Sequence, residues 1–471
     1  MSTEATKTEV GSYFISNYPP YSQWTPEAIP EALSALGSFP ATTSMPEKAI
    51  PEKAIPEKGI PESSILAQPE GLPPLGLYLH IPFCRKRCKF CYFKVFTNVN
   101  AEAIERYVSA LCQEISLVAQ QPLMQDRQFR FVYFGGGTPS FLSVKQLQSL
   151  MDRLHRHVSW NGAEEVTFEC EPGTLSESKV QILKELGVTR LSLGVENFSD
   201  AILEENGRAH LSKEVYRAWE WIAKAEFANV NIDLISGMVG ETWENWKQNI
   251  QKTLELSPES VTIYQMELPF NTVYSKGMLE SQSESAVATW PTKRDWVRYA
   301  FDVFQANGYS ISSAYTVVKD PTKVSFSYRD NLWRGSDLLA TGIASFGHVG
   351  GVHYQNVPEW ERYLSIILDE NRLPIGRAYR PTPQQRLIRE MILQLKKGYL
   401  HVEYFRQKFQ VDILEHWQSE WNAYAADGYV QLPSDSSSKD AEIRLTSDGL
   451  LRVDALLPAF FEPQFRNVRY T

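Results

Sequence analysis

From Leu75 onward the chain alternates between short apolar runs and longer segments of helical periodicity, and this alternation restricts the fold more than any other feature. Each segment between two apolar runs is long enough for a right-handed crossover that joins parallel strands. The pattern predicts six βα units, which could form either an open barrel or a flat doubly wound sheet. The expected strands are Leu77–Pro82, Phe129–Phe134, Glu165–Cys170, Arg190–Val195, Val230–Ser236 and Ser260–Leu268, with helices near 101–120, 143–158, 176–187, 212–227, 242–256 and 292–307.

Composition and patterning divide the chain into four regions. Residues 1–74 are expected to form an N-terminal arm and a linker, because a Pro-Glu-Lys repeat places a proline at every fifth position and blocks a continuous helix. Residues 75–308 contain the βα units, and residues 309–378 are interpreted as extensions of the sheet. Residues 379–471 are interpreted as a mostly helical domain that ends in a hairpin and resembles a winged helix, with helices expected at Arg386–Lys397, Val402–Phe409 and Trp417–Asp427.

Charge and hydropathy limit the classes of function. A formal net charge of −9 and a pI of about 5.6 argue against general binding to nucleic acids, which are polyanions, so no nucleic-acid partner is expected. No apolar run approaches the roughly 18 residues of a membrane span. The first residues have no basic segment followed by an apolar core, which a secretory signal requires. Together with five cysteines that show no disulfide pattern, these features predict a cytoplasmic protein.

Three of the five cysteines lie within eight positions, as Cys84, Cys88 and Cys91, directly after the first expected strand. Thiolates select zinc, copper or iron–sulfur clusters. A structural zinc site usually has four ligands, and no histidine follows within ten residues of Cys91. Three cysteines on one loop suit a 4Fe–4S cluster that keeps one iron without a protein ligand. A substrate or cofactor can bind such an open coordination position and react there. A zinc site remains the alternative interpretation of the three cysteines.

The stretch Tyr78-Leu-His-Ile-Pro-Phe-Cys84-Arg-Lys-Arg-Cys88-Lys-Phe-Cys91 resembles the radical S-adenosylmethionine (SAM) superfamily, in the branch similar to oxygen-independent coproporphyrinogen III oxidase. The resemblance implies a partial (β/α)6 radical SAM barrel, a 4Fe–4S cluster and SAM as cofactors. It also implies an electron donor such as flavodoxin or ferredoxin. The predicted fold class is therefore α/β. The barrel is expected to carry an N-terminal arm and a C-terminal, mostly helical domain that resembles a winged helix.

The same resemblance assigns cofactor-binding residues at the carboxyl ends of the expected strands, where β/α barrels gather function. The glycine-rich turn would hold the methionyl amino group of SAM, since consecutive glycines let the backbone approach a ligand. Glu169 would accept the ribose hydroxyls, with Glu171 as the alternative carboxylate, and Arg208 would meet the SAM carboxylate. The full set is Gly135, Gly136, Gly137, Thr138, Glu169, Glu196, Arg208 and Asp233, with the aromatic Tyr78 and Phe90 beside the cluster; Tyr264, Gln265 and Glu267 are expected to face a substrate.

The resemblance implies oxidative decarboxylation of a propionate side chain in porphyrin biosynthesis, with a tetrapyrrole as the small-molecule substrate. Two departures keep other functions open. Phe93 stands where the oxidases typically have a further cysteine, and Ser-Ala-Tyr-Thr-Val at 313–317 replaces their Asp-His-Phe-Ala. The alternatives are a methyl- or methylene-transferring relative that uses two SAM molecules, and a haem chaperone of the same family. The sequence identifies no catalytic residue beyond those that hold the cofactors.

Overall fold

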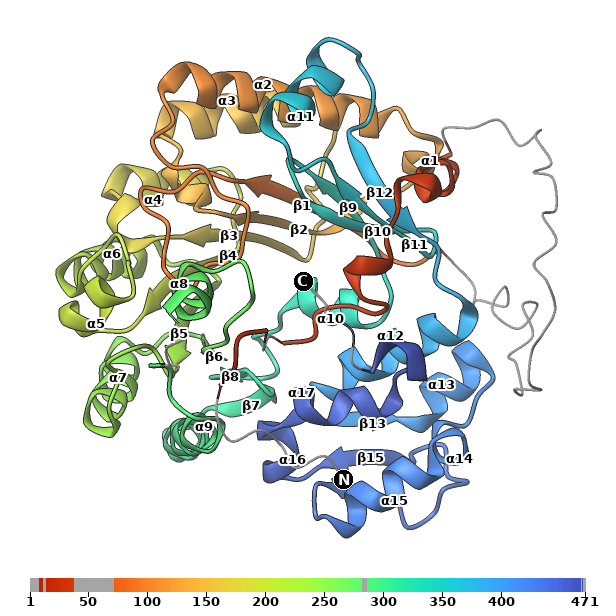
Figure 1. Cartoon of the computed structure of the whole chain (residues 1–471). Helices are drawn as coiled ribbons and strands as arrows, with labels where there is room; N and C mark the ends of the chain where they lie inside the picture. The colour runs from red at the N-terminus through yellow and green to blue at the C-terminus, as the bar shows by residue number, and fades with distance from the viewer. Residues whose placement is uncertain (1–7, 12–13, 38–71, 282–285, 467, 469–471) are drawn as a thin grey trace.

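The computed structural model describes residues 8–11, 14–37, 72–281, 286–466 and 468, and the Pro-Glu-Lys repeat lies outside them. At its centre are six parallel strands, paired in chain order (Figure 1). This confirms the predicted arrangement of βα units, although the sixth strand ends at Gln265, three residues before the predicted end. The strands are β1 (Leu75–Ile81), β2 (Phe129–Gly136), β3 (Glu165–Cys170), β4 (Arg190–Glu196), β5 (Asn229–Ser236) and β6 (Ser260–Gln265).

Helices cover the outer face of these strands (Figure 1). They begin where the sequence supplies capping groups: the Ser143 side chain and Gln146 form a capping box at α3, and Thr242 caps α7. Helices cover one face of the strands and side chains fill the other, so the strands are buried on both faces. Their sequences are therefore nearly continuous apolar runs. The helices are α2 (Ala101–Ala119), α3 (Val144–Leu154), α4 (Glu177–Glu185), α5 (Asp200–Glu205), α6 (Ser212–Ala225), α7 (Trp243–Leu256), α8 (Val273–Ser281) and α9 (Trp290–Ala306).

Residues 310–379 extend the same sheet at both edges. The resulting order is β12-β11-β10-β9-β1-β2-β3-β4-β5-β6-β8-β7, with β9 parallel to β1 and the remaining added strands antiparallel to their neighbours. The added elements are β7 (Ser310–Ser313), β8 (Thr316–Val318), α10 (Ser327–Trp333), β9 (Asp337–Thr341), β10 (Phe346–Val349), β11 (Val352–Asn356), α11 (Trp360–Leu368) and β12 (Ile375–Tyr379).

The C-terminal elements form a small sheet of order β13-β15-β14 with helices packed around it, shown in blue in Figure 1. This region contacts the extended sheet: Ala314, between β7 and β8, donates its N–H to Lys396 O at 2.8 Å. Within the described residues, no helix combines the length and apolar character that a bilayer span requires. The elements are α12 (Pro383–Leu395), β13 (Tyr399–His401), α13 (Val402–Phe409), α14 (Ile413–His416), α15 (Gln418–Ala426), β14 (Val430–Gln431), β15 (Glu442–Leu445), α16 (Ser447–Leu451) and α17 (Val453–Leu456).

The N-terminal arm crosses from the barrel to the C-terminal elements. Gly11 donates its N–H to Leu268 O at 2.7 Å, just beyond β6. Ile15 donates its N–H to the Asp454 carboxylate at 3.1 Å, and the buried Lys396 ammonium pairs with the same carboxylate at 2.6 Å. The helix α1 (Ile29–Leu36) then packs on β11 and β12. The arm therefore joins parts of the chain that are far apart in sequence.

Candidate functional site

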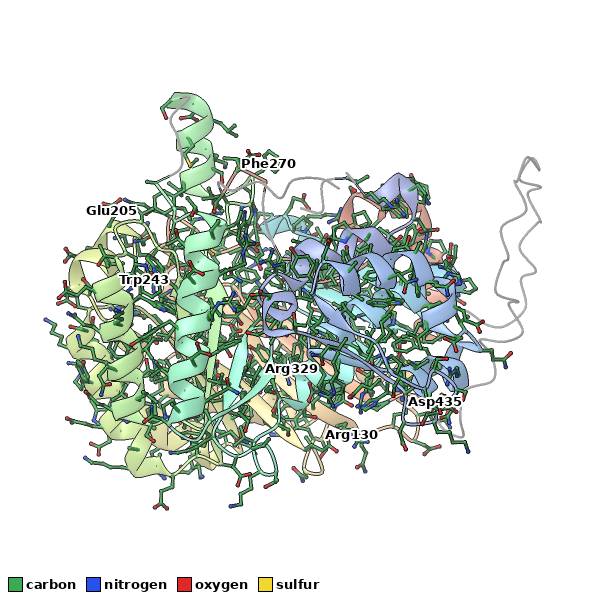
Figure 2. All side chains as sticks on the ribbon, turned by 90° about the horizontal axis from the view of Figure 1, so that it is seen from below. Arg130, Glu205, Trp243, Phe270, Arg329 and Asp435 are labelled. Atoms are coloured by element: carbon green, nitrogen blue, oxygen red, sulfur yellow. The ribbon has the colours of Figure 1, made fainter. Side chains whose placement is uncertain are left out.

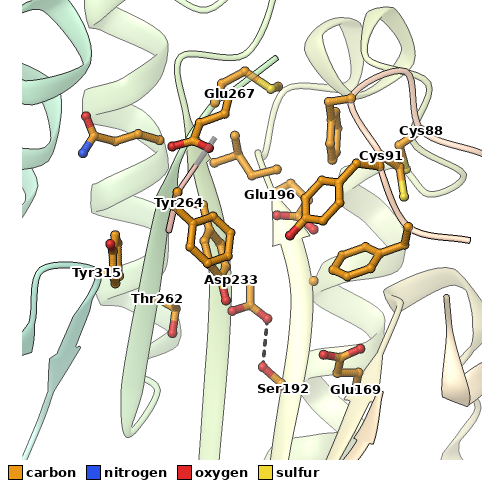
Figure 3. Close-up of a pocket in the computed structure, with 18 of the residues that line it drawn as sticks. Cys88, Cys91, Glu169, Ser192, Glu196, Asp233, Thr262, Tyr264, Glu267 and Tyr315 are labelled. Carbon is orange, nitrogen blue, oxygen red and sulfur yellow. Dashed lines mark hydrogen bonds between the residues drawn. The ribbon is translucent and has the colours of Figure 1, made fainter. Parts of the chain in front are cut away.

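A cavity of about 620 Å³ opens at the carboxyl ends of the parallel strands. Parallel strands end at the same edge, so their terminal side chains converge there. The lining combines the cysteine loop, the ends of β2 to β6, Phe14 of the arm and the segment 450–455. Figure 3 shows Cys88 and Cys91 on one side of the space, with Glu196 and Asp233 directed into it. Residues from widely separated parts of the chain thus line one compartment.

The cysteine loop is fixed at both ends by backbone hydrogen bonds. Cys84 donates its N–H to Phe96 O at 3.1 Å, and Phe96 donates to Pro82 O at 2.8 Å. Neighbouring donors face two of the sulfurs: the Thr138 hydroxyl lies 3.4 Å from Cys84 Sγ, and Arg208 Nη1 lies 3.4 Å from Cys88 Sγ. Burial raises the pKa of Cys84 to about 11 and that of Cys91 to about 12. A bound cation is therefore needed to keep these groups as thiolates.

The cysteine loop does not by itself form a site for a single metal ion. Among the described residues, no three His, Cys, Asp or Glu side chains come close enough to hold one metal ion together. The thiolates that hold a 4Fe–4S cluster bind different irons and stay further apart. The two other cysteines are buried, Cys112 in α2 and Cys170 at the end of β3. The donor set therefore favours three cluster ligands over the zinc alternative.

The glycine-rich turn at the end of β2 lies directly against the cysteine loop. Gly136 has a φ of +118°, and a Cβ built there would lie 2.7 Å from the His80 ring. A Cβ on Gly137 would lie 2.8 Å from Pro82 C and 3.0 Å from Cys84 Sγ. Gly137 donates its N–H to Ile81 O at 2.8 Å. Only glycine lets this turn approach the loop so closely.

Two carboxylates lie at the end of β3, Glu169 within the strand and Glu171 directly after it, and the structure gives them different partners. Glu169 lines the cavity and accepts hydrogen bonds from Tyr133 Oη at 2.7 Å and Gly136 N at 3.1 Å. Glu171 accepts from Arg85 Nη2 at 3.1 Å and from the His210 ring at 3.0 Å. Burial acts to raise the pKa of Glu171, but the hydrogen bond and charge of His210, with Arg208 and Arg85, hold it at about 2. Glu171 therefore anchors the cysteine loop through Oε1, but both carboxylates line the cavity, and the buried Glu171 Oε2 has no partner among the described residues, so the structure leaves both open to a ligand.

Glu196 and Asp233 complete an acidic group around Arg208. Arg208 Nη1 lies 3.5 Å from Glu196 Oε1, and Nη2 donates to Gly194 O at 2.7 Å, whereas the buried Nε has no partner among the described residues. Glu196 reaches this position with a φ of +63°, where the register of β4 and β5 shifts. Asp233 accepts from Ser192 Oγ at 2.8 Å (Figure 3) and from Asn231 Nδ2 at 2.9 Å. The unpaired guanidinium nitrogen is a ready partner for an anionic ligand group.

The acidic group should make SAM binding depend on pH. Burial raises the pKa of Glu169 and Glu196 to about 7 and that of Asp233 to about 6. These side chains are therefore largely neutral below pH 6 and become negative as the pH rises through 7. We expect the affinity of reconstituted protein for the SAM sulfonium cation to fall by about tenfold from pH 8 to pH 6, as one unit of pKa shift corresponds to a tenfold change in equilibrium.

Calorimetric titration with SAM at several pH values measures this effect. Glu196→Gln should reduce the pH dependence, because Glu196 can then no longer ionise while Glu169 and Asp233 still titrate. Glu220→Gln, an equal change on the exposed face of α6, should leave the profile unchanged. An affinity that is constant between pH 6 and 8, or that increases on acidification, contradicts the role given to these carboxylates.

The cavity brings together most of the predicted cofactor-binding residues. Cys84, Cys88, Cys91, Phe90, Gly136, Gly137, Thr138, Glu169, Glu196, Arg208 and Asp233 all line it, as do Tyr264, Gln265 and Glu267. Tyr78 and Gly135 do not belong to the lining. Tyr78 lies behind it, stacked on the Tyr133 ring with centroids 5.9 Å apart and hydrogen-bonded to His80.

The sequence interpretation missed the far end of the cavity and the supports of Asp233. Trp290 and Arg294 of α9, Tyr315 and Arg452 all line the space. Periodicity gave no sign of these contacts, because they come from helices and segments distant in sequence. Ser192, Asn231 and Thr262 were detectable, since polar residues on otherwise apolar parallel strands indicate an interior polar network.

Comparison with known proteins gives consistent matches. The model of the Radical SAM superfamily matches residues 78–252. The heme chaperone HemW of Lactococcus lactis subsp. lactis is 32% identical over 345 residues, covering 72% of this chain and 86% of that protein. The oxygen-independent coproporphyrinogen III oxidase of Synechocystis is 26% identical, covering 76% and 80%. The structure of coproporphyrinogen III oxidase (HemN) from Escherichia coli has a TM-score of 0.75 at 21% identity, covering 95% of this chain and 96% of that chain, and is similar in fold.

Proposed function

Because the chain belongs to the radical SAM superfamily, in the family that includes HemW and the oxygen-independent coproporphyrinogen III oxidases, we propose that it is a SAM-cleaving oxidase of a porphyrinogen. The cofactors of the superfamily are a 4Fe–4S cluster and SAM, which together supply a 5′-deoxyadenosyl radical. In the proposed reaction a hydrogen atom passes from a propionate side chain to the 5′-deoxyadenosyl radical, which becomes 5′-deoxyadenosine. The substrate radical then loses carbon dioxide and gives one electron to an external one-electron acceptor, which leaves a vinyl group.

The residues of this chain would hold and orient the reactants. Cys84, Cys88 and Cys91 would bind the cluster, and the glycine-rich turn would receive the amino group of SAM. Glu169 would accept the ribose hydroxyls, while Arg208 would use its unpaired Nε–H for the SAM carboxylate. Glu196 and Asp233 would hold negative charge near the sulfonium. The contribution of these groups is positioning and electrostatics, since the cofactor carries the reactive atom.

The observation that supports a porphyrinogen is the composition of the far end of the cavity. Trp290, Tyr264 and Tyr315 provide aromatic surface for a large ring system, and Arg294 and Arg452 provide positive charge for carboxylates. The arm and the segment 450–455 cover this compartment, which would exclude water from the reacting C–H bond. The reducing cytoplasm is the compartment that suits an oxygen-sensitive cluster, and we place the reaction there.

Product analysis after anaerobic incubation tests the proposal. Reconstituted protein, SAM, dithionite and coproporphyrinogen III should give 5′-deoxyadenosine and a product lighter by one or two carboxyl groups, resolved by mass spectrometry. SAM cleavage without decarboxylation would remove this substrate. Formation of S-adenosylhomocysteine would instead assign the chain to the methyl- or methylene-transferring enzymes.

A haem chaperone is the second candidate, and the similarity to HemW together with Phe93 favours it. Proteins hold haem iron through His, Cys, Met or Tyr. Among the described residues that line the cavity none is a histidine, so a haem inside it would depend on Met266, Tyr264 or a thiolate. Tight binding of haem in a spectroscopic titration, without decarboxylation of the porphyrinogen, would support the chaperone over the oxidase.

A further inference from the structure

A buried arginine, Arg190, stands at the start of β4 and lines the cavity. It is 2% exposed, whereas Arg130 of β2 lies at the outside of the molecule and pairs with Glu164 (Figure 2). The Arg190 guanidinium lies over the Phe326 ring, 4.6 Å from its centroid, and its Nε and Nη1 have no hydrogen-bond partner among the described residues. Its Nη2 donates to Ser260 Oγ at 3.1 Å. Burial of a cation with so few partners is costly, which indicates a function beyond packing.

From this guanidinium a chain of hydrogen bonds runs across β6 and β5 to the carboxylate of Asp233. Ser260 Oγ donates to Asn231 Oδ1 at 2.9 Å, and Thr262 Oγ1 donates to the same oxygen at 3.0 Å. Asn231 Nδ2 donates to Asp233 Oδ1 at 2.9 Å and to Ser192 Oγ at 3.0 Å. Ser192 Oγ donates to Asp233 Oδ2 at 2.8 Å. The two serines, the threonine and the asparagine are all buried, where such a network fixes the orientation of each side chain.

This hydrogen-bond chain has one direction, because its first member can only donate. A guanidinium has no acceptor atom, so Ser260 must accept from Arg190 and direct its own hydrogen to Asn231. The hydroxyl donors on Oδ1 hold the Asn231 amide with its Nδ2 towards Asp233 and Ser192. Ser192 accepts from that amide, so its hydrogen goes to the second carboxylate oxygen. Both oxygens of Asp233 therefore receive hydrogens from the protein.

Donors on both oxygens favour the ionised form of Asp233, since a protonated carboxyl must keep a hydrogen of its own on one of them. Burial raises the pKa of Asp233 to about 6, and Ser192, Arg190 and Asn231 each act to lower it. The positive charge of Arg190 also opposes the repulsion that Asp233 meets from neighbouring carboxylates. The other titratable groups that face Asp233 are Arg208, Glu169, Glu196, Tyr133 and Tyr264.

We propose that Arg190 is a positioning residue that acts through Ser260 and Asn231 to hold Asp233 as an ionised acceptor directed into the cavity (Figure 3). The inference rests on the proposed function, in which Asp233 holds negative charge near the sulfonium of SAM. It deepens that function, because it identifies the groups that maintain the charge. Arg190 acts through the hydrogen-bond chain and by its charge, and needs no contact with the cofactor.

Arg190→Met tests the proposal, because it removes the charge and the donors but keeps a long side chain. The protonation midpoint of Asp233 should rise by about one pH unit, and infrared difference spectra against Asp233→Asn measure it without SAM. In calorimetric titrations of reconstituted protein, SAM affinity should fall about fivefold at pH 6, as the ionised fraction does, and stay nearly unchanged at pH 8.5, where Asp233 is ionised in both proteins. Arg190→Lys should restore the unmodified profile, since an ammonium is also a cation without an acceptor atom.

A double variant, Ser260→Ala with Thr262→Val, interrupts the chain and retains the arginine. It removes both hydroxyl donors from Asn231 Oδ1, so the amide is free to turn over, and the midpoint of Asp233 should again move to higher pH. Arg389→Met is the matched control. Arg389 is also buried and donates to Asn17 at 2.7 Å, but it is not part of the cavity lining. Its replacement should lower thermal stability and leave the pH profile of SAM binding unchanged.

The proposal is overturned if Arg190→Met weakens SAM binding by the same factor at both pH values, since the arginine would then support the fold alone. It is also overturned if the double variant keeps the midpoint of the unmodified protein, and this variant decides the question if Arg190→Met does not fold. Absence of SAM binding by the unmodified protein at every pH would refute the proposed function. The infrared midpoints would still decide whether Arg190 controls the charge of Asp233.

Discussion

Replacement of Cys88 by alanine should abolish the iron–sulfur cluster and with it the cleavage of SAM. Cys88 is the central cysteine of the loop and a proposed cluster ligand, and its sulfur faces Arg208 at 3.4 Å. The variant would coordinate the cluster through two cysteines instead of three, so the iron content of the reconstituted protein should fall sharply. The rate of SAM cleavage should fall by roughly 10³-fold or more, as for groups that act as one unit. Iron and sulfide analysis and anaerobic turnover assays measure both effects.

Cys112→Ala is the matched control for this change. Cys112 is 4% exposed in the interior of α2, away from the cysteine loop. Its replacement should cost about 1 kcal/mol of folding stability, the usual cost of a single substitution, and should leave iron content and turnover intact. Retention of iron and activity by the Cys88 variant would show that the loop does not hold the cluster.

Gly137→Ala should displace the cysteine loop without changing any ligand. The added Cβ would lie 2.8 Å from Pro82 C, 2.9 Å from Phe83 O and 3.0 Å from Cys84 Sγ. Backbone atoms cannot rotate away as a flexible side chain can, so the turn and the loop must separate. We expect cluster affinity and SAM affinity each to fall by about 10- to 100-fold, the range for changes beside a metal ligand.

Gly277→Ala separates this local effect from a general effect of the substitution. Gly277 lies within α8, and nothing lies within 4 Å of a Cβ placed there. Alanine is favoured over glycine in a helix by about 1 kcal/mol, so this variant should be slightly more stable. Iron content and SAM titration decide the comparison. If Gly137→Ala matches Gly277→Ala in both, the close contact between the turn and the loop has no functional role.

The parallel strands, and the edge of the sheet where the site lies, could be predicted from the sequence because the local pattern of apolar and polar residues determines them. Strands buried on both faces must be apolar throughout, so an aspartate such as Asp233 within one stands out and indicates a site. The pattern could not place β9 beside β1, because that pairing joins residues more than 250 positions apart. Nor could alternation separate Glu169 from Glu171, since both point to the same side of an extended strand. The end of β3 separates them, because the chain turns there and Glu171 meets Arg85 and His210.

The far end of the cavity required the structure for a similar reason. Phe14, Trp290 and Arg452 come from the arm, α9 and the C-terminal region. Each is unremarkable in its own segment, and only tertiary packing brings them together. The substrate is therefore less constrained by sequence than the cofactors, whose proposed ligands lie at or after the ends of successive strands.

Electron paramagnetic resonance of the reduced, reconstituted protein, recorded with and without SAM, tests the central claim most directly. Three cysteine ligands leave one iron open, so the protein should show the signal of a reduced 4Fe–4S cluster, and SAM should change that signal by binding the open iron. A protein that takes up no iron and sulfide, or a cluster whose signal is the same in the presence of SAM, would contradict the account.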